Sequence, residues 1–453
     1  MRWTVLRRFA ISCAVVLLAL PLAARTRPHY GGALHVETEG DPWQKPDGIA
    51  RRLVFDGLTT LDARGTVQAA LATGWESDNA DHRWQFRLRP GVHFHDGSPL
   101  TSTAVMQALN LDCPANCPWA AVHAVGSMVV FTSDSAMPNL PALLAEDQFL
   151  IALTVTADGK TPDGNIGTGA FQVTSFNNGV LELTANEICW QGRPFADAVE
   201  IRAHRSVRDQ WLDLSIGRAD VVEVPVEMLR QAQQQKLTVL VTAPTSLLAL
   251  QVADTGSLAN PMLRAALAAS IDRSALANVI FQKQGEATAS LLPQSLTGFA
   301  FLFPVDRDLN KVHELRGGLA TPTLTLSVDG DGALLLAAQR IALNLKEAGF
   351  NAQEVDAGGA QRADLMLRTI PLEGGEAAAV LESVSRSVGA PAIALDSSPA
   401  SVYRAERGFL DRHTLIPLVD LPRAYATGAR VRDLALDAHG LPDLASASLE
   451  DAP

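Results

Sequence analysis

The segment 324–355 constrains the fold of this chain more than any other part of the sequence. Residues 324–328 have the composition of a strand, and the Asp-Gly-Asp-Gly run that follows predicts a turn. Gly349 is placed to cap a helix, and residues 350–355 predict the next strand. Between turn and cap, apolar residues recur at helical spacing: Leu334, Ala338, Ile341, Leu345 and Ala348. This pattern predicts a βαβ unit beside a parallel sheet.

Shorter elements elsewhere in the chain predict a mixed α/β fold. Residues 84–94 alternate between apolar and polar side chains, with Pro90-Gly91 at the centre, and predict a hairpin with one buried face. Asn260-Pro261 opens a helix, because proline suits the first helical turn. Further strands are expected at 33–38, 180–184 and 199–203, and a short helix at 101–109.

The composition indicates a globular protein and argues against a nucleic-acid partner. Of the 453 residues, 47% are hydrophobic and 19% are charged, which excludes a disordered chain. At about 150 residues per domain, this length predicts two or three domains. The 37 Lys and Arg are outnumbered by 49 Asp and Glu, giving a net charge of -12. A nucleic-acid-binding protein would normally carry a basic face.

The first 24 residues have the three-part pattern of a secretory signal peptide. Arg2, Arg7 and Arg8 form the positive region, residues 9–22 are mostly apolar, and Ala23-Ala24 offer a cleavage site. An uncleaved anchor is the alternative, but the apolar run is short of the roughly 20 residues that span a membrane. We therefore expect residues 1–24 to be removed on export.

Export permits disulfides among the remaining cysteines. Cys113 and Cys117 could close a small loop and leave Cys189 free, or either could form a long-range bridge to Cys189. A zinc site is disfavoured, because a structural site needs four ligands and no second cysteine pair follows.

The candidate catalytic motifs are each incomplete. Asp254-Thr255-Gly256-Ser257 matches one half of an aspartic-protease site, but a second such carboxylate is missing, and the run around Asp396 is a poor substitute. His93 and His95 share one face of a strand, but two ligands are too few for a metal site. Gly167-Thr168-Gly169 lacks the third glycine of a dinucleotide fingerprint. We expect no enzyme activity, no metal and no cofactor.

Taken in order, the motifs resemble the family 5 extracellular solute-binding proteins, the dipeptide and oligopeptide receptors of ABC importers. Residues 86–101 (FRLRPGVHFHDGSPLT) match the family signature FxLRxGVxFHDGxPLT almost throughout. Similar stretches run along nearly the whole chain: GGALHV at 31–36, VFDGL at 54–58, LATGWE at 71–76, GTGAF at 167–171, the residues Asn186, Trp190, Gly192 and Pro194, RAAL at 264–267, SIDR at 270–273 and IPL at 416–418.

The resemblance implies an α/β, two-lobed periplasmic-binding-protein-like fold of the class II or cluster C type, with an additional small domain and a ligand cleft between the lobes. Lobe I would comprise residues 25–41, 161–254 and 421–453. The small domain would span 42–160, and lobe II would span 255–420. One departure stands out: Arg368-Thr369-Ile370-Pro371 occupies the place of a Trp- and Asp-rich stretch that, in peptide receptors, grips the amino terminus of the ligand. The resemblance therefore implies a solute receptor without fixing a peptide as its ligand.

The resemblance also implies where the ligand binds. The family cleft would be faced by Glu39, Asp41, Trp43, Thr168, Gln251 and Arg368. Trp43 could stack on a ligand, and Arg368 could pair with an anionic group. The implied function is that of a periplasmic, monomeric receptor that captures a peptide or small organic solute and delivers it to an ABC permease. A sensor or partner-binding descendant of the fold is the main alternative, and a hydrolase using Asp254 is a third.

Overall fold

The computed structural model describes residues 29–43, 48–62, 64–111, 117–154, 165–298, 303–320, 322–328, 330, 332–355, 363–372, 375–390, 395–396 and 398–450. The expected signal peptide, residues 1–24, and Cys113 lie outside these ranges. Within them, no helix is both long and apolar enough to cross a membrane.

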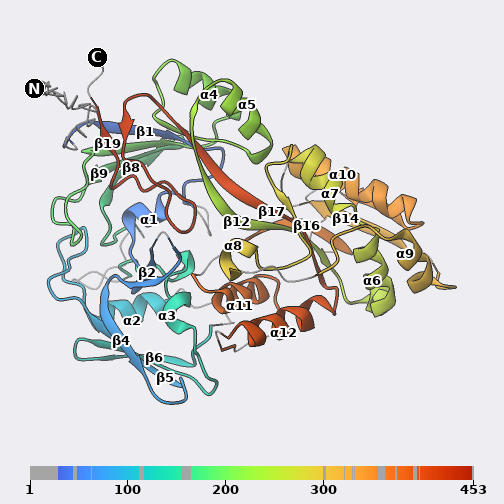
Figure 1. Ribbon diagram of the computed structural model, residues 1–453. Helices are drawn as coiled ribbons and strands as arrows, with labels where there is room; N and C mark the ends of the chain where they lie inside the picture. The colour runs from blue at the N-terminus through green and yellow to red at the C-terminus, as the bar shows by residue number, and fades with distance from the viewer. Residues whose placement is uncertain are drawn as a thin grey trace, which may run out of the picture.

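One mixed sheet runs through the whole molecule (Figure 1). Parallel pairs occur at both of its ends, where β14 lies between β15 and β16 and where β1 lies between β10 and β11. The strand order is β15 (Asn351–Val355), β14 (Thr323–Val328), β16 (Leu365–Pro371), β12 (Thr238–Val252), β17 (Leu415–Thr427), β11 (Val221–Glu223), β1 (Ala33–Glu37), β10 (Ala198–Arg202), β9 (Val180–Ala185) and β8 (Phe171–Asn177), with β13 (Glu286–Ala287) paired to β17.

The two long strands β12 and β17 join the two parts of the molecule. They pair antiparallel with several register shifts, so the ladder bends along its length. In Figure 1 they run from the part that holds β1, β8 and β9 to the part that holds α6, α9 and α10. Residues 238–251 and 415–427, which are far apart in the sequence, therefore lie side by side where the chain passes from one part to the other.

A second, four-stranded antiparallel sheet lies apart from the large one, in the order β4 (Ala72–Ser77), β5 (Arg83–Leu88), β7 (Met128–Thr132) and β6 (Ala121–Val125). The alternating pattern of residues 84–94 predicted one buried face, and this is confirmed for β5, since Trp84, Phe86 and Leu88 are buried. The predicted hairpin is wrong, however: β5 pairs with β4 and β7, and His93 makes only a single bridge to Pro99. Two short ribbons complete the strands: β2 (Thr59–Leu61) with β3 (Val67–Ala69), and β18 (Val431–Arg432) with β19 (Ser448–Leu449).

The predicted βαβ unit is confirmed. Strands β14 and β15 pair in parallel, and α10 (Gly332–Glu347) connects them with Ala338, Ile341 and Leu345 fully buried. Gly349, just after the end of α10, has a φ of +79°, a backbone conformation that favours glycine. The Asn260-Pro261 prediction is also confirmed, because the Asn260 side chain caps α6 (Pro261–Ser270) by accepting from the Met262 N–H.

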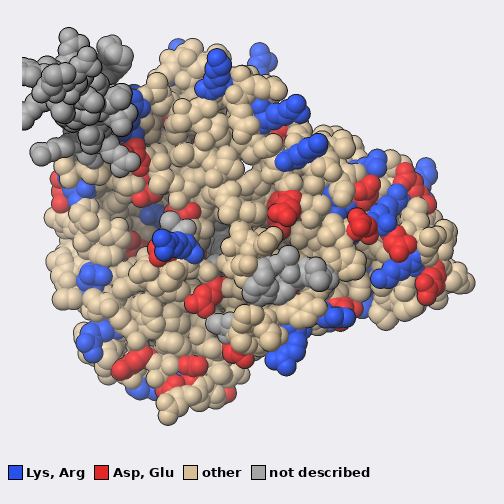
Figure 2. All heavy atoms as spheres, in the orientation of Figure 1, with Lys and Arg blue, Asp and Glu red and all other residues tan. Residues whose placement is uncertain are grey.

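The remaining helices are α1 (Arg51–Val54), α2 (Ser102–Leu111), α3 (Leu140–Leu143), α4 (Val207–Ser215), α5 (Leu229–Gln234), α7 (Arg273–Ala275), α8 (Gln294–Thr297), α9 (Leu309–Arg316), α11 (Ala377–Ser387) and α12 (Pro399–Leu410). Buried apolar side chains form separate groups around β14 and α10, under the four-stranded sheet, and around β1 and β10. On the face that Figure 2 shows, acidic and basic side chains are interspersed over the described residues.

The state of the cysteines excludes one of the two disulfide arrangements that the sequence left open. Cys117 is disulfide-bonded, whereas Cys189 carries a free, buried thiol. The long-range bridge to Cys189 is therefore excluded. Burial raises the pKa of the Cys189 thiol, which makes it a poor nucleophile.

Candidate ligand-binding cleft

A cavity of about 720 Å³ lies where the large sheet passes between the two parts of the molecule. We call it the cleft. Its walls come from the segments that follow β1 and β11, from β16, from the middle of β17 and from the start of α10. The lining residues are Thr38, Glu39, Gly40, Asp41, Pro42, Gly48, Ile49, Glu223, Val224, Pro225, Val226, Ser246, Leu334, Arg368, Thr369, Pro371, Pro422, Arg423, Ala424 and Tyr425.

One wall of the cleft is acidic, and it is formed by the ends of β1 and β11 and the segments that follow them. Because β1 and β11 are parallel neighbours, their carboxyl ends bring Glu39 and Glu223 together. The Glu39 backbone N–H donates to Glu223 Oε2 at 2.8 Å, which orients that carboxylate. The exposed Asp41 contributes a third carboxylate, and its Oδ1 accepts from the Trp43 N–H at 2.8 Å.

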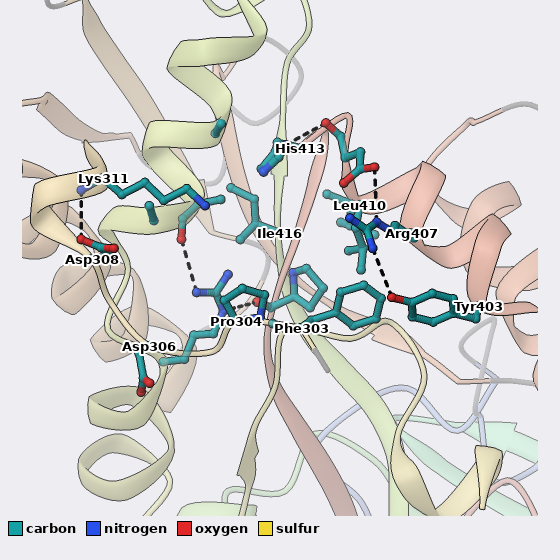
Figure 3. Close-up of a pocket in the computed structure, with 18 residues that line it drawn as sticks. Phe303, Pro304, Asp306, Asp308, Lys311, Tyr403, Arg407, Leu410, His413 and Ile416 are labelled. Atoms are coloured by element: carbon teal, nitrogen blue, oxygen red, sulfur yellow. Dashed lines mark hydrogen bonds and ion pairs between the residues drawn. The ribbon is translucent and has the colours of Figure 1, made fainter. Parts of the chain in front are cut away.

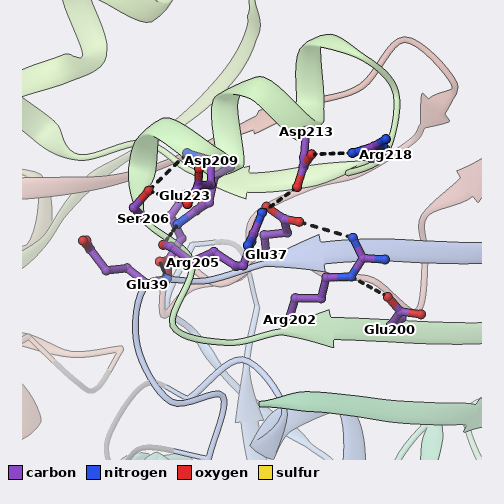
Figure 4. A network of polar contacts seen from close by, with 11 residues as sticks. Glu37, Glu39, Glu200, Arg202, Arg205, Ser206, Asp209, Asp213, Arg218 and Glu223 are labelled. Atoms are coloured by element: carbon purple, nitrogen blue, oxygen red, sulfur yellow. Dashed lines mark hydrogen bonds and ion pairs between the residues drawn. The ribbon is translucent and has the colours of Figure 1, made fainter. Parts of the chain in front are cut away.

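A polar network behind this wall holds the two segments in place (Figure 4). The fully buried Gln210 accepts from the Glu223 N–H at 3.0 Å and donates to the Arg205 carbonyl oxygen at 3.0 Å. Arg205 in turn donates its backbone N–H to the carbonyl oxygen of Thr38 at 3.0 Å. The start of the cleft segment after β1 and the end of β11 are therefore positioned by one set of hydrogen bonds.

The arginines of this network are occupied by other carboxylates. Arg205 forms an ion pair with Asp213 at 2.7 Å, and Arg202 forms one with Glu200 at 2.7 Å. Both also lie 3.6 Å from the buried Glu37 carboxylate. Burial raises the pKa of Glu37, and the nearby Arg205 opposes that shift.

Burial also raises the pKa of Glu223. The Glu39 N–H and the charge of Arg423 oppose this shift, whereas the charge of Glu39 adds to it. A raised carboxylate pKa in a cleft means that a cation placed beside the group would stabilise its charged form. The acidic wall is therefore suited to a cationic group.

The facing wall is basic. Arg368 lies on β16 opposite Ala249 of β12, and its Nη1 donates to Gln251 Oε1 at 3.4 Å. Its Nε is buried and has no hydrogen-bond partner among the described residues. Gln251 does not line the cleft, so it contacts Arg368 from behind. A guanidinium group with open donors is suited to a carboxylate or another anion.

The other two predicted residues lie in the core beside the cleft. Trp43 is half-buried against the core around β1, with its ring 6.2 Å from that of Phe55 between centroids. Thr168 is fully buried, and its hydroxyl donates to Asp56 Oδ2 at 2.7 Å. Neither lines the cleft. The structure thus brings Glu39, Asp41 and Arg368 together and places Gln251 behind Arg368.

Glu223, Ser246 and Arg423 line the cleft and were missed by sequence reasoning. The signal for Glu223 was the β-branched pair Val221-Val222 followed by a charged residue, which is typical of a short strand that ends in a polar group. No sequence pattern predicted that this strand would lie beside β1, because that neighbour depends on the sheet order.

The signature 86–101 has a structural role here. His95 accepts from the Gly167 N–H through Nδ1 at 3.3 Å, and its Nε2 lies 3.0 Å from the Gly169 carbonyl oxygen. This arrangement requires a neutral ring with the proton on Nε2, and burial lowers the pKa of His95 accordingly. Gly97 adopts φ of +81° in the adjoining turn. Through His95, the signature therefore connects the chain that follows β5 to residues 167–169 by hydrogen bonds.

A second cavity, of about 630 Å³, lies beside α6, α9 and α12 (Figure 3). Its polar side chains mostly serve the local fold: Asp308 caps α9, and Arg407 donates to the Tyr403 hydroxyl at 3.3 Å. Arg273 donates to the Pro417 carbonyl oxygen, and burial lowers the pKa of Arg273 to about 10. This second cavity is lined by only one of the two parts of the molecule, whereas the cleft is lined by both.

Comparison with known proteins identifies the family. The family sequence model of the bacterial extracellular solute-binding proteins, family 5, matches residues 66–355 of this chain. The chain belongs to this family. The family 5 assignment confirms the resemblance on which the predicted fold was based.

Two curated relatives align with this family 5 chain over different lengths. An uncharacterized Bacillus subtilis protein, YhjP, is 32% identical over 173 residues, which is 35% of this chain and 29% of that protein. A probable di/tripeptide-binding protein of Pseudomonas aeruginosa is 24% identical over 408 residues, covering 77% of this chain and 75% of that protein.

Solved structures show the same fold. The oligopeptide-binding protein AppA from Bacillus subtilis, in complex with a nonapeptide, superimposes with a TM-score of 0.77 at 15% identity. The superposition covers 94% of this chain and all of AppA. The family 5 chain therefore has the mixed α/β, two-lobed fold of the periplasmic binding proteins, as the sequence predicted.

Proposed function

We propose that this family 5 protein is the periplasmic receptor of an ABC importer. It captures a peptide or another small organic solute in the cleft, closes its lobes around it and presents the closed form to a membrane permease. The observation that carries this proposal is the cleft itself: its volume of about 720 Å³ lies within the usual range of ligand sites, and groups of opposite charge converge on it.

Within this proposal, Glu39, Asp41 and Arg368 contact the ligand, and Gln251 orients Arg368. Lobe I comprises 25–41, 161–254 and 421–453, the small domain 42–160, and lobe II 255–420. The separate four-stranded sheet supports the small domain, and the core around β14 and α10 supports lobe II. The name of the Pseudomonas relative, the nonapeptide bound to AppA and the signal-peptide pattern support a peptide-like ligand and a periplasmic location.

The protein acts as a monomer without a catalytic step. The family consists of binding proteins, and the aspartic-protease-like Asp254 is exposed at the start of a turn and does not line the cleft. No observation favours the sensor or partner-binding alternative over the importer receptor.

Native mass spectrometry of the freshly purified mature protein, before and after mild denaturation, tests the proposal. We expect a small molecule to be released, because a ligand at 100 times its Kd adds about 2.7 kcal/mol of stability and stays bound through purification. A protein that carries no ligand and shows no thermal shift with peptides, amino acids or sugars would contradict the receptor function.

A further inference from the structure

The second cavity, which Figure 3 shows, is lined by a buried cation with open hydrogen-bond donors. Arg273 has only 5% of its surface exposed. Its Nε donates to the Pro417 carbonyl oxygen at 2.8 Å, and its Nη1 reaches the carbonyl oxygens of Ala268 and Val305 at 3.3 and 3.5 Å. Nη2 makes no hydrogen bond within the described part of the chain, and it is not among the atoms sealed off from solvent. Two N–H groups of this guanidinium group are therefore available to a ligand in the cavity.

The charge of Arg273 has no counter-ion among the residues that the structure describes. Burial lowers the pKa of Arg273 to about 10, and no nearby carboxylate opposes that shift. A buried charge is costly unless a partner of opposite charge compensates it. The carbonyl oxygens that Arg273 contacts carry only partial charge, so an anion from outside would stabilise the guanidinium group more than they do.

Two further cations make the cavity more positive. In Figure 3 the Lys311 side chain extends from α9 into the cavity, and Lys311 forms no ion pair within the described ranges. Arg264, which is 8% exposed, does not line the cavity and donates to backbone carbonyl oxygens. Burial lowers the pKa of the cavity residue His413; the charges of Lys311 and Arg264 add to that shift, whereas Asp411 opposes it. Both cations therefore act on this space.

The acidic residues around the cavity have other partners or other directions. Asp308 accepts from the Lys311 backbone N–H at 2.9 Å and caps α9. Asp411 pairs with Arg407 at 3.9 Å. Asp306 is exposed, and its carboxylate points away from the cavity in Figure 3. The charged groups that remain to face a ligand are therefore cationic.

The rest of the cavity is mostly apolar, with an aromatic wall. The rings of Phe303 and Tyr403 stack with their centroids 5.7 Å apart. The small side chains that α6 presents leave the space open: Ala265, Ala268 and Ala269. The volume of about 630 Å³ lies within the usual range of ligand sites. The cavity therefore suits an apolar ring that carries an anionic group.

We propose that the second cavity is a binding site, separate from the cleft, for a small organic carboxylate with an aromatic body. The carboxylate binds at Arg273 Nη2 and the Lys311 ammonium group, and the ring packs between the aromatic wall and the alanines of α6. Because one part of the molecule supplies the whole lining, the site does not depend on closure of the cleft. The inference goes beyond the proposed receptor function, since both sites can be occupied at once.

Isothermal titration of the mature protein with 3-phenylpropionate, and with its neutral amide as the paired probe, tests this site. We expect one site for the carboxylate and at least about tenfold weaker binding of the amide, the effect of losing one charge-assisted hydrogen bond. Lys311→Gln should weaken binding of the carboxylate by about threefold or more, as for an exposed charge pair, and leave the amide unchanged. Ala268→Leu, which fills the cavity, should abolish binding of both probes.

The controls separate this site from the cleft and from a loss of folding. Lys346→Gln changes an exposed lysine outside the cavity and should bind both probes as the wild type does. Arg368→Gln, in the cleft, should also bind them unchanged. Arg273 is left in place because its carbonyl contacts hold α6 and β17 together, and the preference for the carboxylate that persists in Lys311→Gln measures its share.

Three outcomes would overturn the proposal. One is equal affinity of the wild type for carboxylate and amide. Another is binding that survives Lys311→Gln and Ala268→Leu but is lost in Arg368→Gln, which would place the probe in the cleft. The third is no binding at about 10 mM probe, since even the low efficiency of weak ligands gives a molecule of this size a millimolar Kd. Each of these outcomes would leave the receptor function intact.

Discussion

Asp420 should make this protein less stable as the pH rises toward neutrality. It lies on β17 with 3% of its surface exposed, opposite Leu247 of β12 and Glu286 of β13. Burial raises the pKa of Asp420 to about 8, and the charge of Glu286 adds to the shift. In the unfolded chain the same carboxyl has a pKa of about 3.8. The folded state therefore keeps a proton that the unfolded state loses between these two values.

The sign and size of the effect follow from this difference in bound protons. Where the folded state holds one more proton, the free energy of unfolding falls by about 1.36 kcal/mol for each unit of rising pH. Both pH 5 and pH 7 lie inside this window, so Asp420 alone lowers the stability by about 2.7 kcal/mol between them. Asparagine resembles the protonated acid in shape and carries no charge at either pH.

Urea unfolding of wild type and Asp420→Asn at pH 5 and pH 7 measures this contribution. The variant's free energy of unfolding, relative to wild type, should rise by about 2.7 kcal/mol from pH 5 to pH 7. Asp433→Asn, which changes an exposed aspartate, serves as the control. A relative stability of Asp420→Asn that stays constant within about 0.5 kcal/mol would refute the reasoning.

Two further substitutions probe contacts that hold the parts of the molecule together. Arg386 of α11 pairs at 2.8 Å with the fully buried Glu146, so Arg386→Ala should cost about 3–5 kcal/mol in urea unfolding, and adding Glu146→Gln should recover part of that loss. An unchanged midpoint in Arg386→Ala would contradict the buried pair. A side chain at Gly167 would overlap the Val54 carbonyl oxygen, so Gly167→Ala should cost at least about 3 kcal/mol, whereas Gly74→Ala, with open space around it, should cost less than about 1 kcal/mol. Similar midpoints for the two glycine variants would show that the Gly167 contact relaxes freely.

Local sequence patterns determined the elements of this protein but not all of their partners. The turn, apolar stripe and Gly349 cap predicted the βαβ unit, and Asn260-Pro261 predicted the start of α6, because each pattern acts within one or two helical turns. The same reasoning failed at 84–94. Alternation shows that a strand has one buried face, but it does not show which strand lies beside it, and β5 pairs with β4 and β7.

The cleft was only partly accessible to sequence reasoning for the same reason. The family resemblance indicated Glu39, Asp41 and Arg368 as positions facing the cleft, but Glu223 joins them only because β11 lies in parallel beside β1 in the sheet. Trp43 directly follows cleft residues in the sequence, yet its ring packs near that of Phe55. The Thr168 hydroxyl donates to Asp56 and does not line the cleft. The sequence by itself indicated the βαβ unit, the start of α6 and the family of this chain. The order of the large sheet decided which charged side chains face one another, because residues 39, 223 and 368 meet only through long-range strand pairing.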